Sequence, residues 1–110
     1  MDTIAERRME LRVEGRTFEV VAKLARPEQD TPHDSWKCQY EVTFGADSRT
    51  MDIHGEDALQ ALQLSMVTLD GELKHGAKSR GGVLYHLDMP FTSLLENSGM
   101  QIRPLEKSPE

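Results

Sequence analysis

Two histidine–carboxylate pairs are the residues best suited to chemistry in this sequence. Asp52 and His54 are separated by one residue, and His86 and Asp88 have the same spacing. Residues i and i+2 of a β-strand point to the same face, so each pair would present an imidazole beside a carboxylate. If the two strands were neighbours, the four side chains could bind a divalent metal or act as acid and base. The simpler interpretation is a solvated polar face, which any half-buried sheet has.

The single cysteine, Cys38, is the other residue that could react. It lies in the stretch WKCQYEVTF, residues 36–44, where apolar and polar side chains alternate without a break. This period of two predicts a strand with one apolar face, and Cys38 falls in the middle of that face. Nucleophilic cysteines need an exposed, electropositive setting, so the pattern predicts a buried, inert thiol.

The elements that must position these residues follow from the remaining periodicity. Strands are predicted over residues 4–13, 17–25, 36–44 and 49–54. The first two should form a hairpin around Glu14-Gly15, because glycine accepts the positive φ of a tight turn. Residues 25–35 hold two prolines and are expected to form an exposed loop. Residues 83–89 are expected to form a fifth strand, and residues 100–105 one more extended piece.

One long helix is predicted after the fourth strand, because the apolar period changes there from 2 to about 3.6. Asp57 and Gln60 have the spacing of a capping box and mark its start, and Gly76 marks its end. Five apolar residues at spacings of three and four form one stripe: Leu59, Leu62, Met66, Leu69 and Leu73.

A second apolar face on the same helix is formed by Leu64, Val67 and Gly71. A helix that is apolar on two faces contacts something with each of them. The favoured interpretation is that the C-terminal segment covers this face, and the alternative is a second protein chain. The apolar residues available in that segment are Val83, Leu84, Leu87, Phe91, Leu94 and Leu95.

The predicted fold class is α+β: an antiparallel β-meander of four to five strands packed against one long α-helix, with a short C-terminal extension. The 110 residues, 37% hydrophobic and 29% charged, are expected to form a single domain over residues 4–105 with a frayed tail over 106–110. The net charge of -6 argues against nucleic acid and anionic membranes as partners. With no signal-peptide pattern and one cysteine, a cytoplasmic protein is expected.

Two further charged clusters are weaker candidates for sites. Lys74, His75, Lys78 and Arg80 precede two glycines and could hold a phosphate, but cations at a helix C-terminus are also favoured by the dipole. An acidic group in the predicted loop, Glu28, Asp30 and Asp34 with His33, could meet a basic partner, although such loops are usually only solvated.

Four stretches resemble a family of small uncharacterised bacterial proteins that is known as a domain of unknown function. They are IAERRMEL at residues 4–11, RPEQD at 26–30, WKCQYEV at 36–42 and GEDALQALQLSM at 55–66. The resemblance covers roughly residues 4–75. It implies a bacterial, cytoplasmic, single-domain protein, and it implies no activity, cofactor or catalytic residue.

The favoured hypothesis is a non-enzymatic protein that binds a protein partner or forms a homodimer through Leu64, Val67 and Gly71. No cofactor is expected, because no cofactor or metal motif is present. The alternative is a small enzyme or a metal- or ligand-binding domain that uses Asp52, His54, His86 and Asp88 on the polar outer face of the sheet.

Overall fold

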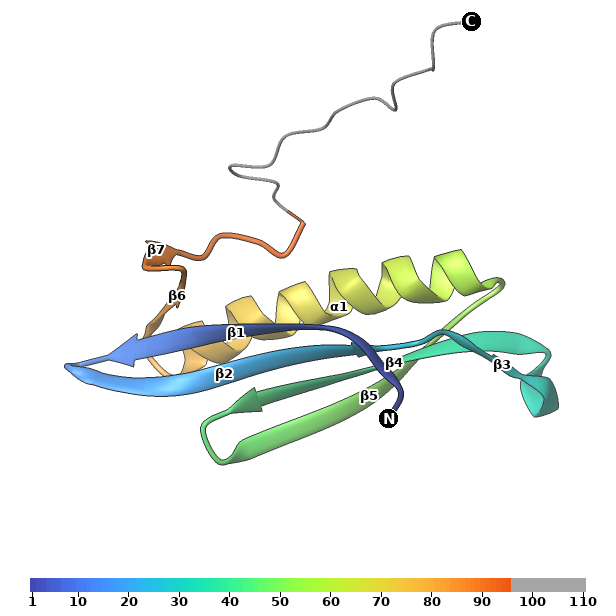
Figure 1. Ribbon diagram of the computed structural model, residues 1–110, viewed down its shortest axis with the longest axis horizontal. Helices are drawn as coiled ribbons and strands as arrows, with labels where there is room; N and C mark the ends of the chain where they lie inside the picture. Colours follow the sequence, from blue (N-terminus) through green and yellow to red (C-terminus); the bar gives the residue numbers. More distant parts are fainter. Residues whose placement is uncertain (96–110) are drawn as a thin grey trace, which may run out of the picture.

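Seven strands form one antiparallel sheet, and one long helix packs against a single face of it (Figure 1). The α+β class predicted from the periodicity is therefore confirmed. The computed structural model describes residues 1–95. The extended piece predicted at 100–105 and the tail at 106–110 lie outside the described residues, as does the end of the predicted domain.

Two long hairpins make up most of the sheet. Strands β1 (Thr3–Val13) and β2 (Arg16–Ala25) pair along their whole lengths, as do β4 (Ser35–Phe44) and β5 (Asp47–Gly55). The first hairpin turns at Glu14-Gly15, whose φ angles of 46° and 78° give the tight turn that the sequence predicted. Since β2 also pairs with β4, the four strands form the predicted meander.

The loop predicted at residues 25–35 contains a short strand, β3 (Glu28–Asp30), and a 3-10 turn, η1 (Thr31–His33). β3 pairs with the first residues of β4. Because β5 pairs with β4 from end to end, β2 and β3 share the opposite edge of β4. The prolines that favoured a loop, Pro27 and Pro32, both lie outside the three paired residues, so they do not interrupt the ladder.

After the helix the chain reaches the opposite edge of the sheet, beside β1. β6 (Val83–His86) pairs with β1, and β7 (Met89–Pro90) pairs with β6. The single fifth strand predicted over residues 83–89 is therefore wrong. Leu87 and Asp88 have φ angles of 53° and 60°, and two consecutive left-handed residues reverse the chain into a hairpin.

Helix α1 (Ala58–Ser79) begins where its capping residues predicted. The Asp57 side chain accepts a hydrogen bond from the Gln60 backbone N–H (2.7 Å), and the Gln60 side chain accepts one from the Glu56 N–H (2.7 Å). Its predicted end at Gly76 is wrong, because α1 continues to Ser79. Gly76 serves packing instead, because a Cβ there would overlap the ring of Phe44.

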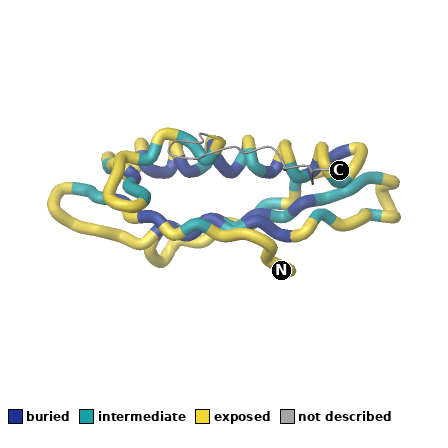
Figure 2. Tube along the Cα trace, turned by 45° about the horizontal axis from the view of Figure 1, so that its top comes forward, coloured by how far each residue is buried: buried dark blue, intermediate teal, exposed yellow. Residues whose placement is uncertain are grey.

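The core lies between the helix and the sheet face that it covers (Figure 2). The predicted helical stripe is right for Leu69 and Leu73, which are buried, and wrong for Leu59, which is 63% exposed. The stripe is rotated because small residues, Ala61 and Ser65 among them, face the sheet and allow close approach. No helix within residues 1–95 combines the length and apolar character that crossing a membrane requires.

Cys38 is fully buried in this core, as predicted. Its Sγ–H donates to the carbonyl of Ala25 (3.3 Å), and burial raises the pKa of the thiol. The Ser65 hydroxyl donates to the Cys38 carbonyl (3.3 Å), which joins α1 to β4 at this point. A neutral thiol under a helix has no access to a substrate, so Cys38 is a packing residue.

Candidate functional site

The structure does not bring together the four residues of the predicted histidine–carboxylate site. Asp52 and His54 lie on β5, whereas His86 ends β6. Strands β4, β2 and β1 stand between β5 and β6, which places the two pairs roughly 19 Å apart at the usual strand spacing. The two pairs therefore contribute to separate regions of the molecule.

His86 and Asp88 do not form a pair even with each other. Asp88 lies in the turn between β6 and β7 with its side chain 91% exposed, and it accepts a hydrogen bond from Arg12 Nη2 (2.9 Å). His86 lies on the same face of β6 as Leu84, toward the core. Burial and the nearby charge of Arg7 lower the pKa of His86.

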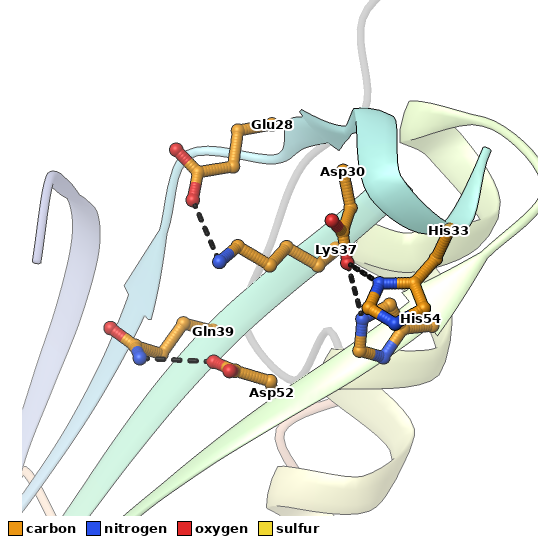
Figure 3. A network of polar contacts seen from close by, with 7 residues as sticks. All are labelled: Glu28, Asp30, His33, Lys37, Gln39, Asp52 and His54. Atoms are coloured by element: carbon orange, nitrogen blue, oxygen red, sulfur yellow. Dashed lines mark hydrogen bonds and ion pairs between the residues drawn. The ribbon is translucent and has the colours of Figure 1, made fainter. Parts of the chain in front are cut away.

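A different polar cluster forms around His54 at the other end of the sheet (Figure 3). Asp30 Oδ2 lies 2.9 Å from His33 Nδ1 and 3.2 Å from His54 Nε2, so one carboxylate oxygen serves two imidazoles. The hydrogen bond from His33 outweighs burial and, with that from His54, holds the pKa of Asp30 below its usual value. The cluster ties β3 and η1 to β5.

The other acidic groups near this cluster are also engaged. Asp52 accepts a hydrogen bond from Gln39 Nε2 (3.0 Å), and Lys37 Nζ lies 3.3 Å from Glu28 Oε1 (Figure 3). The contact with Glu28 raises the pKa of Lys37. Within residues 1–95, no group of three or more His, Cys, Asp and Glu side chains is arranged to hold a metal ion.

Two of the four residues considered for an anion site, Arg80 and Lys74, are bound within the fold. Arg80 Nη1 donates to the carbonyl of Gly76 (3.1 Å), and its Nη2 lies 3.3 Å from Asp47. Lys74 Nζ lies 2.7 Å from Asp70 Oδ2. The contact between Arg80 and a carbonyl of the last helical turn matches the helix-end interpretation of this cluster.

The second apolar face of α1 is exposed. The side of α1 opposite Leu69 and Leu73 carries Leu64 (43% exposed), Val67 (55% exposed) and the exposed Gly71. We call these three residues the outer face of α1. The C-terminal segment was predicted to cover it, and that interpretation is wrong for the residues proposed. Those that pack do so against the core, namely Leu84, Phe91 and Leu94.

A buried carboxylate explains where the C-terminal segment goes. Asp70, 6% exposed, accepts hydrogen bonds from the Leu94 backbone N–H (2.7 Å) and the Ser93 hydroxyl (3.2 Å) and contacts Lys74. Burial alone would raise the pKa of Asp70, but these contacts outweigh it and lower the pKa. The described part of the segment is thus fixed beside the inner face of α1, and no segment within residues 1–95 covers the outer face.

Little in the sequence predicts this contact. Asp70 and Lys74 have the i, i+4 spacing of an exposed helical ion pair. The one signal was an acidic residue directly after Leu69, on the border of the apolar stripe.

Together these features define a small α+β protein. A single helix covers one face of its sheet, and the other face carries ion pairs between solvent-accessible side chains. The chain matches the family model "Domain of unknown function (DUF6968)" over residues 5–94, and it belongs to this family. The match confirms that the chain belongs to a domain of unknown function, and it extends beyond the stretches named from the sequence through β6 and β7. No curated protein and no solved structure matches the chain.

Proposed function

We propose that this protein is a non-enzymatic interaction module that self-associates through the outer face of α1. The observation that carries the proposal is the exposure of Leu64 and Val67 on the side of the helix that faces away from the sheet. Fully burying an exposed side chain of this size contributes about 1.5–3 kcal/mol, and about half of that remains to be gained at these two half-exposed positions. An exposed apolar strip on a helix bordered by polar residues is typical of a contact surface.

The charges at the two ends of α1, Glu56 directly before the N-cap and Lys78 in the last turn, favour a second copy as the partner. If two helices pack antiparallel with Val67 at the twofold axis, residues equally distant from Val67 face each other. Lys78 and Glu56 are each eleven positions from Val67, so each Lys78 would meet the Glu56 of the other copy. Both residues are exposed, and neither has an ion-pair partner within residues 1–95.

Gly71 supports the same arrangement. A Cβ added at Gly71 would meet nothing within 4 Å, so no intramolecular contact requires glycine there. Glycine in the middle of a helix is unfavourable by roughly 0.5–1 kcal/mol relative to alanine. In the antiparallel pair, Gly71 would lie opposite Gln63 and would let the two backbones approach closely.

The test is the mass of the protein in solution, measured by light scattering and sedimentation over a range of concentrations. The wild type should form a dimer, and Leu64→Glu combined with Val67→Glu should be a folded monomer by circular dichroism. The matched control, Leu59→Glu with Leu87→Glu, adds the same charge at two exposed apolar positions outside the outer face and should weaken the dimer much less. A wild type that is monomeric at every concentration contradicts the proposal.

Charge reversal tests the orientation of the pair. Lys78→Glu and Glu56→Lys should each weaken the dimer, and the double variant should restore it, because the predicted contact is then rebuilt with opposite signs. A double variant as weak as the sum of the two single variants would contradict the antiparallel arrangement.

A ligand site on the polar face of the sheet is the second candidate. It is supported by Asp30, held between His33 and His54, and not by the four residues named from the sequence. The support is smaller because the carboxylate is already paired with two imidazoles. Titration with zinc, followed through the histidine ring resonances, tests it: shifts confined to His33 and His54 would favour a ligand site.

A further inference from the structure

One half of β1 has an unpaired edge. β1 pairs with β2 from Thr3 to Val13, but on its other side it pairs with β6 only from Glu10 to Arg12. Within residues 1–95, no strand pairs with Thr3–Met9 on that side. We call Thr3–Met9 the free edge of β1. An unpaired edge presents a row of backbone N–H and C=O groups to any strand that can dock there.

A small apolar cleft opens beside this free edge. It has a volume of about 160 Å³ and lies between β1, β2, α1 and the C-terminal segment. Its apolar walls come from Ala5, Ala22, Leu24, Met66, Leu69 and Leu94. A strand added to the free edge would direct alternate side chains toward this cleft.

Arg7 gives the cleft its charge. It lies opposite Ala22 in the β1–β2 ladder, so it shares the core-facing side of the sheet, where β1 otherwise carries Met9 and Leu11. Within residues 1–95 it has no ion-pair partner, whereas the neighbouring Arg8 is bound to Glu19 (3.1 Å).

The groups around Arg7 do not neutralise it. His86 comes from β6 on the same face, and burial together with the charge of Arg7 lowers its pKa, so it does not pair with Arg7 as an anion would. Glu6 borders the cleft, but its carboxylate lies 3.9 Å from Arg8 on the opposite face of the sheet. Asp70, which lies on α1 next to the cleft residue Leu69, is already bound to Lys74 and Leu94. An unpaired cation on a half-buried face attracts a carboxylate from outside.

A second copy of this chain fits the free edge poorly. Two copies paired antiparallel along all of Thr3–Met9 would centre on Glu6 and set two Glu6 carboxylates against each other. A register centred one residue further sets Arg7 against Arg7. Like charges directly opposite each other destabilise a strand pair.

We propose that the free edge of β1 binds an extended acidic segment of a partner protein by strand addition. The segment carries an acidic residue that faces Arg7 and, two positions away, an apolar residue that enters the cleft beside Ala5. The i, i+2 spacing follows from the alternation of side chains along a strand. This surface is separate from the outer face of α1, so the inference does not depend on self-association.

The test uses two acetylated and amidated hexapeptides, Thr-Leu-Thr-Glu-Thr-Leu and the same sequence with Lys in place of Glu. Leucine on both sides of the charged residue fits either strand direction. The full-length protein is titrated with each peptide while backbone amide resonances and hydrogen exchange are followed. The acidic peptide should bind about tenfold more tightly than the basic one, and the changes should be confined to Thr3–Met9 and the cleft.

Substitutions of Arg7 separate the local charge from the overall charge. Arg7→Gln should remove the preference for the acidic peptide, and Arg7→Glu should reverse it. The matched control is Arg16→Glu, an exposed arginine of the same hairpin with no ion-pair partner within residues 1–95, and it should keep the preference. Arg7→Gln keeps the inference testable if Arg7→Glu does not fold.

Three outcomes would overturn the inference. One is equal affinity of the wild type for the two peptides. Another is the same effect from Arg16→Glu as from Arg7→Glu, which would show a long-range charge effect. The third is strong protection of the Thr3–Met9 amides on the free side in the absence of peptide, because another segment of the chain or a second copy would then occupy the edge.

Discussion

The two faces of α1 are both apolar, yet only one of them is core. The inner face holds Leu69 and Leu73, which are 3% and 0% exposed, whereas Leu64 and Val67 on the outer face are about half exposed. The inner face also carries Ala61, Ser65, Gly76 and Ala77, which are small enough for the backbone to lie close to the sheet. Small residues beside large ones, and not the large ones by themselves, mark the face that packs.

The largest expected effect is at the centre of the inner face. Leu73→Ala should lower the free energy of unfolding by about 2–5 kcal/mol, because it leaves a cavity in a fully buried position. Leu59→Ala, at an exposed position of the same helix, should change it by less than about 0.5 kcal/mol. Urea denaturation followed by circular dichroism measures both. Similar losses for the two variants would break the distinction between the faces.

Asp70, at the border of the inner face, should give the next largest effect. Asp70→Asn should lower the free energy of unfolding by about 1.5–3 kcal/mol at neutral pH, because hydrogen bonds to a buried charge are lost. The pKa of Asp70 is lowered by folding, so its contribution is present above the usual carboxyl pKa of 3.8 and is lost as the pH falls through the folded value.

The loss caused by Asp70→Asn should therefore shrink in acid. Denaturation curves recorded from neutral to strongly acidic pH measure this change. Asp88→Asn, whose side chain is 91% exposed, is the control and should show no comparable loss at neutral pH. If the loss of stability caused by Asp70→Asn did not vary with pH, Asp70 would stabilise the fold through packing and not through its charge.

The two glycines of α1 sharpen the comparison, because substitution by alanine should change the free energy of unfolding in opposite directions at the two positions. Gly76→Ala should destabilise the fold by about 1–3 kcal/mol, since its Cβ would meet the ring of Phe44. Gly71→Ala has open space around it and should stabilise the monomer by about 0.5–1 kcal/mol. Thermal unfolding of both variants at low protein concentration gives the comparison. Destabilisation by Gly71→Ala would show that the outer face is packed.

The smallest effect on folding is expected on the outer face. Leu64→Ala and Val67→Ala should each change the free energy of unfolding of the monomer by less than about 0.5 kcal/mol. Each should instead raise the dissociation constant of the dimer about tenfold, since an anchor at an interface contributes more than about 1 kcal/mol. Sedimentation over a concentration series separates the two quantities. A large loss of monomer stability would place these residues in the core.

Much of the fold was predictable because the patterns that carry it are local. The alternation in WKCQYEVTF predicted β4 and the burial of Cys38, and Asp57 with Gln60 predicted the start of α1. β3 and β7 were not predicted, because strands of three and two residues have too few positions to show a period. Gly76 resembled a helix end, but its role depends on Phe44, which is distant in the sequence.

The candidate sites were less predictable than the fold. Asp52 and His54 share a strand as expected, but their distance from His86 depends on β6 pairing with β1 and not with β5. The partner of His54 is Asp30, from a segment expected to be a loop. Arg7 was missed, although the sequence holds a signal for it, because a cation there occupies an apolar position of an alternating strand.

The sequence by itself determined the α+β class, the four long strands, the start of the helix and the presence of two apolar faces on it, because period and capping act between residues close in the chain. Only the tertiary structure decided that the C-terminal segment does not cover the outer face of α1, since Asp70 binds the backbone at Leu94 and fixes that segment beside the inner face. The tertiary structure also left half of β1 without a partner on one side, because β6 is only four residues long. Both features rest on contacts between distant parts of the chain, which local pattern does not encode.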